Sequence, residues 1–244
     1  MLILLGAMRQ EVDGVRRRLG LTRGFDCEGW RIFEGEYEGR GLALVETGPG
    51  RYRAESAAVF AQLRYPATAL ISFGFAGGLN DNVRAGDVVL CQVLHDGAVR
   101  GEEASHRSDD KLISLAIGIP LRSSSRVLLG NSVTVERMVT EPRDKRALDE
   151  AFGADVVDME GYWIADAAVD VPFLAVRAIS DPVTQQLPPF DRWIDPEEGW
   201  NIGLAASHFL MHPLELATLP TLYANVQRAE SSLVQLIAEI IQRL

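Results

Sequence analysis

The sequence predicts one α/β domain over all 244 residues, a three-layer α/β/α arrangement with a mixed central sheet. Short apolar segments alternate with segments of helical spacing, which is typical of a sheet covered by helices on both faces. A hairpin-like pair near the start indicates a mixed rather than a purely parallel sheet. No Pro-, Gly- or Ser-rich linker divides the chain, so we expect a single domain in which residues 190–244 form a helical C-terminal extension.

Short apolar runs locate the strands, and apolar residues three or four positions apart locate the helices. Residues 2–6 form such a run, and residues 11–19 then place three apolar side chains on one helical face. Residues 30–37 and 41–46 are separated by Glu-Gly-Arg, which favours a hairpin. In chain order, we expect strands at residues 2–6, 30–37, 41–46, 67–73, 87–93, 126–129, 155–157 and 173–179, and helices at residues 11–19, 54–63, 141–152 and 160–168.

The ends of the central strands carry the segments of chemical interest. The predicted strand at residues 67–73 ends in a glycine-rich turn, residues 74–78, whose glycines let a ligand approach the backbone closely. This turn lacks the GxGxxG spacing, so it does not predict a dinucleotide site. The strand at residues 173–179 leads directly into Ser180 and Asp181. Because ligands of open α/β sheets bind beyond the carboxyl ends of the strands, we expect the site there.

Composition excludes several classes of partner. The formal net charge of -10 lacks the basic field that nucleic-acid binding requires, so we expect no nucleic-acid partner. Cys27 and Cys91 have no metal-ligand spacing, and neither do the four histidines, so we expect free thiols, no metal and no cofactor. The apolar start has no basic region before it, and no uncharged apolar stretch of about 18 residues follows. We therefore expect a cytoplasmic protein.

Three carboxylates are expected near the strand ends. Asp181 follows an apolar strand, where burial raises the pKa of a carboxyl group and suits it to general acid catalysis; alternatively, Asp181 caps an element that begins at Pro182. Glu11 and Glu160 each open a predicted helix, where the helix dipole favours an acidic residue. Alternatively, Glu11 polarises a water molecule and Glu160 accepts hydrogen bonds from two sugar hydroxyls. The residues alone leave both interpretations open.

Four motifs resemble those of the purine nucleoside phosphorylase and nucleosidase superfamily. Residues 6–12 resemble the first-strand motif of its methylthioadenosine/S-adenosylhomocysteine nucleosidases, and residues 72–79 and 86–89 resemble the central glycine segment and the strand after it. Val-Asp-Met-Glu at residues 157–160 resembles the ribose-binding motif, and residues 171–181 resemble the strand that carries the catalytic acid. The resemblance covers residues 1–185 in one order and implies a nucleoside phosphorylase-like fold.

The resemblance implies a role for each carboxylate. Asp181 would protonate the purine, and bond breaking would leave an oxocarbenium-like ribosyl centre. Glu11 would orient and deprotonate the attacking water, while Glu160, with Met159 beside it, would bind the ribose hydroxyls. Val133 stands where the family places an aromatic residue that stacks on the base, so stacking would be weaker here. The other substrate-binding residues implied in this way are Phe75, Ala76, Gly77 and Ser180.

Two positions favour hydrolysis over phosphorolysis. Phosphorylases of the superfamily generally place an arginine two residues before the central glycine and a Ser or Thr just after it, and here these residues are Ser72 and Phe75. A phosphate site without its arginine lacks the strongest available contact to the anion. We therefore expect a hydrolase, with a phosphate-dependent phosphorylase or a nucleoside-binding protein without turnover as alternatives.

The C-terminal third of the sequence narrows the choice of substrate. Residues 187–189, 212–214 and 219–222 resemble the hopanoid-associated branch of the superfamily, which is linked to removal of adenine from adenosylhopane. Methylthioadenosine, adenosylhomocysteine and futalosine are the alternative substrates. The last apolar helices could shape a lipid groove or approach a membrane surface. The alternative is that they form a packed cap or a dimer face. The resemblance also implies a homodimer.

Overall fold

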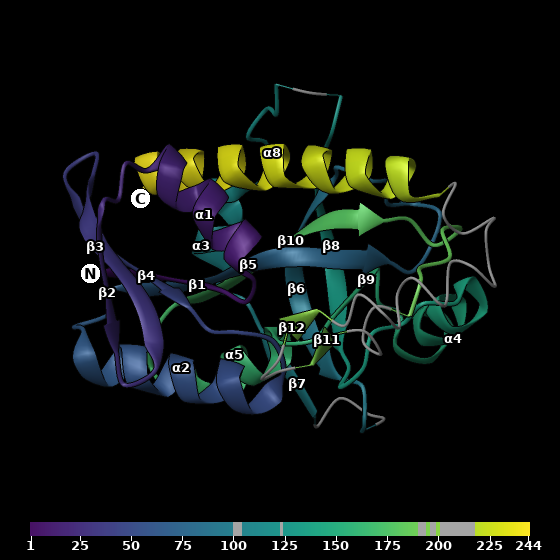
Figure 1. Ribbon diagram of the computed structural model, residues 1–244, viewed down its shortest axis with the longest axis horizontal. Coiled ribbons are helices and arrows are strands. Elements are labelled where there is room, and N and C mark those ends of the chain that lie inside the picture. Colours follow the sequence, from purple (N-terminus) through teal and green to yellow (C-terminus); the bar gives the residue numbers. More distant parts are fainter. Residues whose placement is uncertain (100–103, 123, 190–193, 196–198, 201–217) are drawn as a thin grey trace.

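The computed structural model describes residues 1–99, 104–122, 124–189, 194–195, 199–200 and 218–244 (Figure 1). Its centre is a mixed sheet of ten strands. The strands of this sheet are β1 Leu2–Gly6, β2 Arg23–Cys27, β3 Trp30–Tyr37, β4 Arg40–Glu46, β5 Ala69–Gly78, β6 Val88–Asp96, β7 Ser105–Arg107, β8 Val127–Thr134, β9 Val156–Asp158 and β10 Phe173–Asp181. The described helices are α1 Arg9–Arg18, α2 Arg51–Arg64, α3 Asp110–Ala116, α4 Pro142–Phe152, α5 Gly161–Ala167 and α8 Leu219–Arg243.

The strand pairing explains why the sheet is mixed. The order is β10-β6-β8-β9-β5-β1-β4-β3-β2, with β7 paired to β6. Strands β4, β1, β5 and β10 run parallel, whereas the β3–β4 hairpin and the β6–β10 pair are antiparallel. Because β10 also pairs with β5, the strands β5, β10, β6, β8 and β9 close on themselves. The predicted α/β class with a mixed sheet is confirmed.

Helices cover both faces of the sheet. Helices α1, α3 and α8 lie on one face, and α2 and α5 lie on the other (Figure 1). Alternate side chains of the central strands point to opposite faces, so Leu4 and Ile71 pack under α1 and α8, whereas Leu5 and Leu70 pack under α2 and α5. This arrangement leaves the carboxyl ends of β1, β5 and β10 at one edge, with α4 beside β9.

The structure differs from the sequence prediction in two places that matter for the site. Residues 74–78 continue β5 instead of forming a turn, because β10 pairs with them along one edge and β9 with Gly77 and Gly78 on the other. Ser180 and Asp181 are likewise the last residues of β10, not residues beyond it. Before residue 190, three elements were not predicted: β2, β7 and α3. The short edge strand β2 buries none of its side chains fully, so it lacks an apolar signal.

In the C-terminal part, the described helix is α8. Helix α8 buries Leu233, Leu236 and Ile237 against the sheet and α1, so its apolar stripe forms a packed cap. Residues Ile194–Asp195 (β11) and Gly199–Trp200 (β12) pair as an antiparallel ladder where a helix was expected. The proline at position 196 disfavours helical geometry in the residue before it. Residues 212–214, used above for the resemblance, lie outside the described residues.

No helix among the described residues is long and apolar enough to cross a membrane.

Candidate active site

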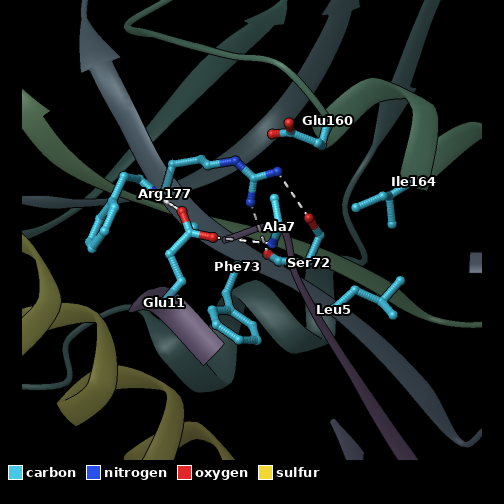
Figure 2. Close-up of a pocket in the computed structure, with 10 residues that line it drawn as sticks. Leu5, Ala7, Glu11, Ser72, Phe73, Glu160, Ile164 and Arg177 are labelled. Carbon is cyan, nitrogen blue, oxygen red and sulfur yellow. Dashed lines mark hydrogen bonds between the residues drawn. The ribbon is translucent and has the colours of Figure 1, made fainter. Parts of the chain in front are cut away.

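A small cavity lies between the carboxyl end of β1, the middle of β5 and β10, the first turn of α1 and the start of α5 (Figure 2). Its volume is about 10 Å³, which is the space that one water molecule requires. Figure 2 shows the guanidinium of Arg177, from β10, with the carboxylates of Glu11 and Glu160 on either side. The cavity is lined by Leu5, Ala7, Glu11, Ser72, Phe73, Gly74, Phe75, Glu160, Ile164 and Arg177.

Glu11 is fixed by three backbone N–H groups. Met8 and Ala7 donate to its Oε2 at 2.8 and 3.1 Å, and Phe75 donates to its Oε1 at 2.7 Å. The bond from Met8 closes the first turn of α1, and the bond from Phe75 ties this turn to β5. Burial raises the pKa of Glu11, although these hydrogen bonds and Arg177 oppose the shift. Glu11 can therefore serve both as a helix cap and as a base, because its Oε1 can accept a further hydrogen bond from a molecule in the cavity.

Arg177 and Asp158 form a buried ion pair that the sequence analysis did not identify. Arg177 Nε lies 2.5 Å from Asp158 Oδ2, and both side chains are almost completely buried. The guanidinium also donates to the Ser72 carbonyl oxygen at 3.2 Å, to the Ser72 hydroxyl at 2.9 Å and to the Val176 carbonyl oxygen at 3.1 Å. These four bonds occupy four of the five N–H groups of an arginine. One N–H is left to donate into the cavity that Arg177 lines.

Glu160 stands at the N-cap position of α5, but its side chain does not cap the helix. Its Oε1 instead accepts a hydrogen bond of 2.9 Å from the backbone N–H of Gly50. Burial, followed by the like charges of Asp158 and Glu11, raises the pKa of Glu160 to about 7. A favourable helix dipole does not by itself explain why a glutamate stands here, because the Glu160 side chain makes no helix cap and is repelled by two neighbouring carboxylates.

The raised pKa of Glu160 affects the stability of the fold. A glutamate in the unfolded chain titrates with an ordinary pKa of 4.5, so ionised Glu160 lowers the stability of the folded state as the pH rises from 4.5 to about 7. We expect Glu160→Gln to raise the free energy of unfolding at pH 8 by about 1–3 kcal/mol and to leave it nearly unchanged at pH 4.5. Urea unfolding at both pH values measures this, with the exposed Glu150→Gln as control. An equal effect at both pH values would contradict the prediction.

Asp181 ends β10 and is paired with a buried lysine. Lys145 Nζ, from α4, lies 2.6 Å from Asp181 Oδ2, and the Lys145 side chain is completely buried. The Ser180 hydroxyl donates to Asp181 Oδ1 at 2.6 Å. Burial raises the pKa of Asp181, and Lys145 and then Ser180 oppose the shift. A turn follows Asp181, closed by the Gln185 N–H on the Pro182 carbonyl oxygen, and no helix forms within residues 182–189. Among the described residues, the partners of the Asp181 carboxylate are Lys145 and Ser180, not N–H groups of this turn.

The remaining predicted site residues lie along the same strands. A Cβ atom on Gly77 would lie 3.0 Å from Asp181 Oδ2, so glycine is needed for the carboxylate to approach β5 this closely. The Ser180 hydroxyl, whose proton goes to Asp181, also lies 3.3 Å from the Ala76 carbonyl oxygen, and Met159 is partly buried beside Glu160. Val133, in β8, is completely buried and packs in a cluster with Leu79, Ala154 and Val157. Its predicted contact with the base stays a prediction.

Glu11 and Glu160 thus share one cavity with Arg177, and Asp181 lies on β10 four residues beyond Arg177. Within the described ranges, no three His, Cys, Asp or Glu side chains are grouped as metal ligands would be. The sequence profile of the Phosphorylase superfamily matches residues 2–205. The chain belongs to this superfamily. The superfamily predicted from the four motifs is therefore confirmed.

Relatives of this superfamily member include nucleosidases. The 5'-methylthioadenosine/S-adenosylhomocysteine nucleosidase of Listeria welshimeri is 28% identical over 212 residues, which cover 78% of this chain and 91% of the relative. The crystal structure of the nucleosidase of the same name from Neisseria meningitidis, in complex with methylthio-immucillin-A, has a TM-score of 0.77 at 22% identity and covers 100% of this chain and 99% of that one. Futalosine hydrolase of Helicobacter pylori has a TM-score of 0.78 at 17% identity, with 100% and 97% covered. The two structures share the fold of this chain.

Proposed function

We propose that this superfamily member is a nucleosidase that hydrolyses the N-glycosidic bond of an adenosine-type nucleoside and releases adenine. The observation that carries the proposal is the cavity between Glu11, Glu160 and Arg177, which has the size of one water molecule. The carboxylates accept hydrogen bonds from such a water, and Arg177 donates one to it. The nucleosidase relatives act on substrates of the same class by name.

The same cavity disfavours phosphate as the attacking group. Two carboxylates line this cavity, and their negative charges would repel a phosphate ion. The guanidinium of Arg177 is held by Asp158 and Ser72, so it cannot offer the bidentate contact that phosphate sites use. Ser72 itself is buried with its hydroxyl on Arg177. These contacts agree with the hydrolase interpretation of Ser72 and Phe75 from the sequence.

The proposed mechanism gives each carboxylate a separate task. Asp181 protonates the purine ring nitrogen that faces it, so the base leaves as a neutral molecule. Glu160 holds the ribose hydroxyls as the sugar becomes oxocarbenium-like, and its negative charge stabilises the developing positive charge. Glu11 takes the proton of the water that attacks the anomeric carbon. Gly77 lets the base approach β5 beside Asp181.

An assay of base release tests this proposal. We expect the purified protein to release adenine and a free ribosyl sugar from at least one adenosine-type nucleoside, at the same rate in phosphate-free buffer and in phosphate. Chromatography quantifies the base, and mass spectrometry of the product made in ¹⁸O-labelled water detects the label at the anomeric carbon. Release that requires phosphate and yields ribose 1-phosphate would contradict hydrolysis. Binding without turnover on every nucleoside would contradict the enzyme proposal.

The substituent at the ribose 5′ position is a finer proposal. We propose an adenosine with a large apolar 5′ group, adenosylhopane in the first place, because the C-terminal third resembles the hopanoid-associated branch. The stripe of α8 contributes no lipid groove, since it is buried against the sheet. The same assay compares kcat/KM for adenosylhopane, methylthioadenosine, adenosylhomocysteine and futalosine, and a preference for any of the last three would contradict this assignment. The homodimer also stays a proposal, which light scattering in solution tests.

A further inference from the structure

Lys145 is the buried charged side chain for which the proposed mechanism has no task. It comes from the first half of α4, it is completely buried, and its ammonium group lies 2.6 Å from Asp181 Oδ2. A buried lysine is expensive to keep charged unless it is well paired. Its position directly behind the proposed acid therefore requires an explanation.

Three oxygen atoms surround the amino group of Lys145. Besides Asp181, Nζ donates to the carbonyl oxygens of Pro182 and Gln185, each at 3.2 Å. An ammonium ion makes these three contacts by donating to all three oxygens, whereas a neutral amine makes them by donating to the two carbonyl oxygens and accepting from a protonated Asp181. Either way the pair shares one proton across the 2.6 Å between Nζ and Asp181 Oδ2. We take the ammonium–carboxylate form as the resting one, because the charges of this form are paired within the buried site.

A general acid must hold a proton before it can donate one, and the resting carboxylate of Asp181 holds none. We propose that Lys145 stores the proton that Asp181 delivers to the leaving purine, so that Lys145 and Asp181 act as one proton-donating pair. Lys145 does not touch the substrate and acts through Asp181, which makes it a positioning residue for the proton. This inference rests on the proposed nucleosidase function.

One proton passes through the pair in the proposed step, and a second proton leaves the attacking water. As the glycosidic C–N bond breaks, its electron pair moves into the purine. Asp181 accepts the proton of Lys145 Nζ and passes it to the ring nitrogen that faces Asp181, so Asp181 is again a carboxylate and Lys145 ends as a neutral amine. The attacking water loses its proton to Glu11. After the products leave, Glu11 returns its proton to solvent and solvent restores the proton of Lys145.

Among the described residues, no other charged side chain forms a hydrogen bond or ion pair with Lys145 or Asp181. Lys145 is the one charged group whose field acts on the pKa of Asp181. The charged side chains around the pair on α4 and on the adjoining strand ends bind elsewhere or face solvent: Glu141 binds Gln186, Asp144 binds Arg143, Arg146 binds Asp81, Asp149 binds Asn80, Asp155 binds Asn131, Asp158 binds Arg177, and Glu150 is exposed. The proton of the pair is therefore shared between Lys145 and Asp181 alone.

The pH dependence of Lys145→Met tests the proposal. In the natural protein Lys145 holds the proton to be delivered while Asp181 is ionised, so ionisation of Asp181 does not end activity. In the variant the proton sits on Asp181 alone, and we expect the alkaline limb of kcat/KM to move to lower pH by at least about one unit, with at least a tenfold loss at pH 9. Lys145→Arg keeps the charge but does not release a proton, so we expect it to lose activity as well. Arg146→Met, on the same helix, is the matched control and should not shift the limb.

The outcomes are distinct. A lower rate with an unmoved alkaline limb would make Lys145 a structural residue and overturn the proposal. A limb that moves to higher pH, or an active Lys145→Arg, would show that the lysine acts only through its charge, and would also overturn it. Thermal unfolding of each variant identifies one that fails to fold, and Lys145→Met, similar in length and uncharged, is the variant expected to fold.

A second measurement does not depend on turnover. Infrared difference spectra against Asp181→Asn report whether the Asp181 carboxyl is ionised at pH 7. We expect a carboxylate band in the natural protein and a carboxylic acid band in Lys145→Met. A protonated Asp181 in the natural protein would overturn the proposal, even if base release confirms the nucleosidase. If no nucleoside releases its base, the proposed function fails, and the spectra still decide where the proton of the pair rests.

Discussion

Asp181→Asn is expected to lower base release from an adenosine-type nucleoside by about 10³-fold while ligand affinity stays within about tenfold. The amide keeps the size of the side chain and a hydrogen bond to Ser180, but it has no proton to donate. Without protonation the purine must leave as an anion, which is a far poorer leaving group. Steady-state kinetics gives the loss of turnover, and calorimetric titration with a substrate analogue gives the affinity.

A riboside whose leaving group needs no proton separates this role from a structural one. With 4-nitrophenyl riboside, Asp181→Asn should retain turnover within about tenfold of the natural protein, because nitrophenolate leaves readily as an anion. Loss of both activities, or retention of purine release, would remove Asp181 from the role of acid. The variant also leaves the Lys145 ammonium without its buried carboxylate, which costs about 3–5 kcal/mol where the lysine stays charged. The double variant with Lys145→Met removes both charges and controls for that loss of stability.

The three carboxylates could be predicted from the sequence because each one is local to a strand end. Apolar runs end at Gly6 and Ile179, and the residues after them fall at the edge where α/β folds bind ligands. The motif that contains Glu160 follows the same rule after β9. The order of these motifs along the chain then favoured one family, and the family profile and the fold confirm it.

The charged partners of these carboxylates could not be predicted in the same way. Lys145 precedes Asp181 by 36 residues and comes from a helix, so no local spacing joins them. Arg177 does leave a signal, because an arginine inside the apolar run of β10 must find a buried partner, but the sequence does not say that this partner is Asp158. Long-range ion pairs depend on how the sheet closes, and that closure has no periodic signature.

The glycine segment shows how a site can override local propensity. Residues 74–78 contain three glycines, which favour a turn over a strand, yet residues 74–77 pair with β10 and Gly78 pairs with β9. A Cβ atom on Gly74 would lie 2.8 Å from Glu11 Oε1, and one on Gly77 would lie 3.0 Å from Asp181 Oδ2. The glycines therefore bring two carboxylates against one strand, which is a tertiary requirement that a turn prediction does not contain.

Glu11→Gln is expected to lower turnover by about 10³-fold on both the purine nucleoside and 4-nitrophenyl riboside, since both reactions need an activated water. The glutamate accepts hydrogen bonds from the N–H groups of Met8, Ala7 and Phe75 on two oxygens. Glutamine has one oxygen and one NH₂ group, so it cannot accept all three of these bonds. Some loss of stability is therefore expected along with the loss of the base. Urea unfolding measures the stability, and both rates are followed at saturating substrate.

Glu11→Asp and added nucleophiles distinguish the base from the helix cap. Aspartate keeps the negative charge but is one methylene shorter, so its carboxylate lies farther from the cavity. If Glu11 is only a helix cap, Glu11→Asp should lower the stability of the fold without a selective loss of water attack. If Glu11 activates the water, azide, which needs no deprotonation, should restore nitrophenol release in Glu11→Gln and yield ribosyl azide. Failure of azide to restore any turnover in a folded variant would contradict the role of base.

Because Asp181→Asn loses only the purine reaction and Glu11→Gln loses both, the two variants together assign the leaving-group proton and the water proton to different carboxylates.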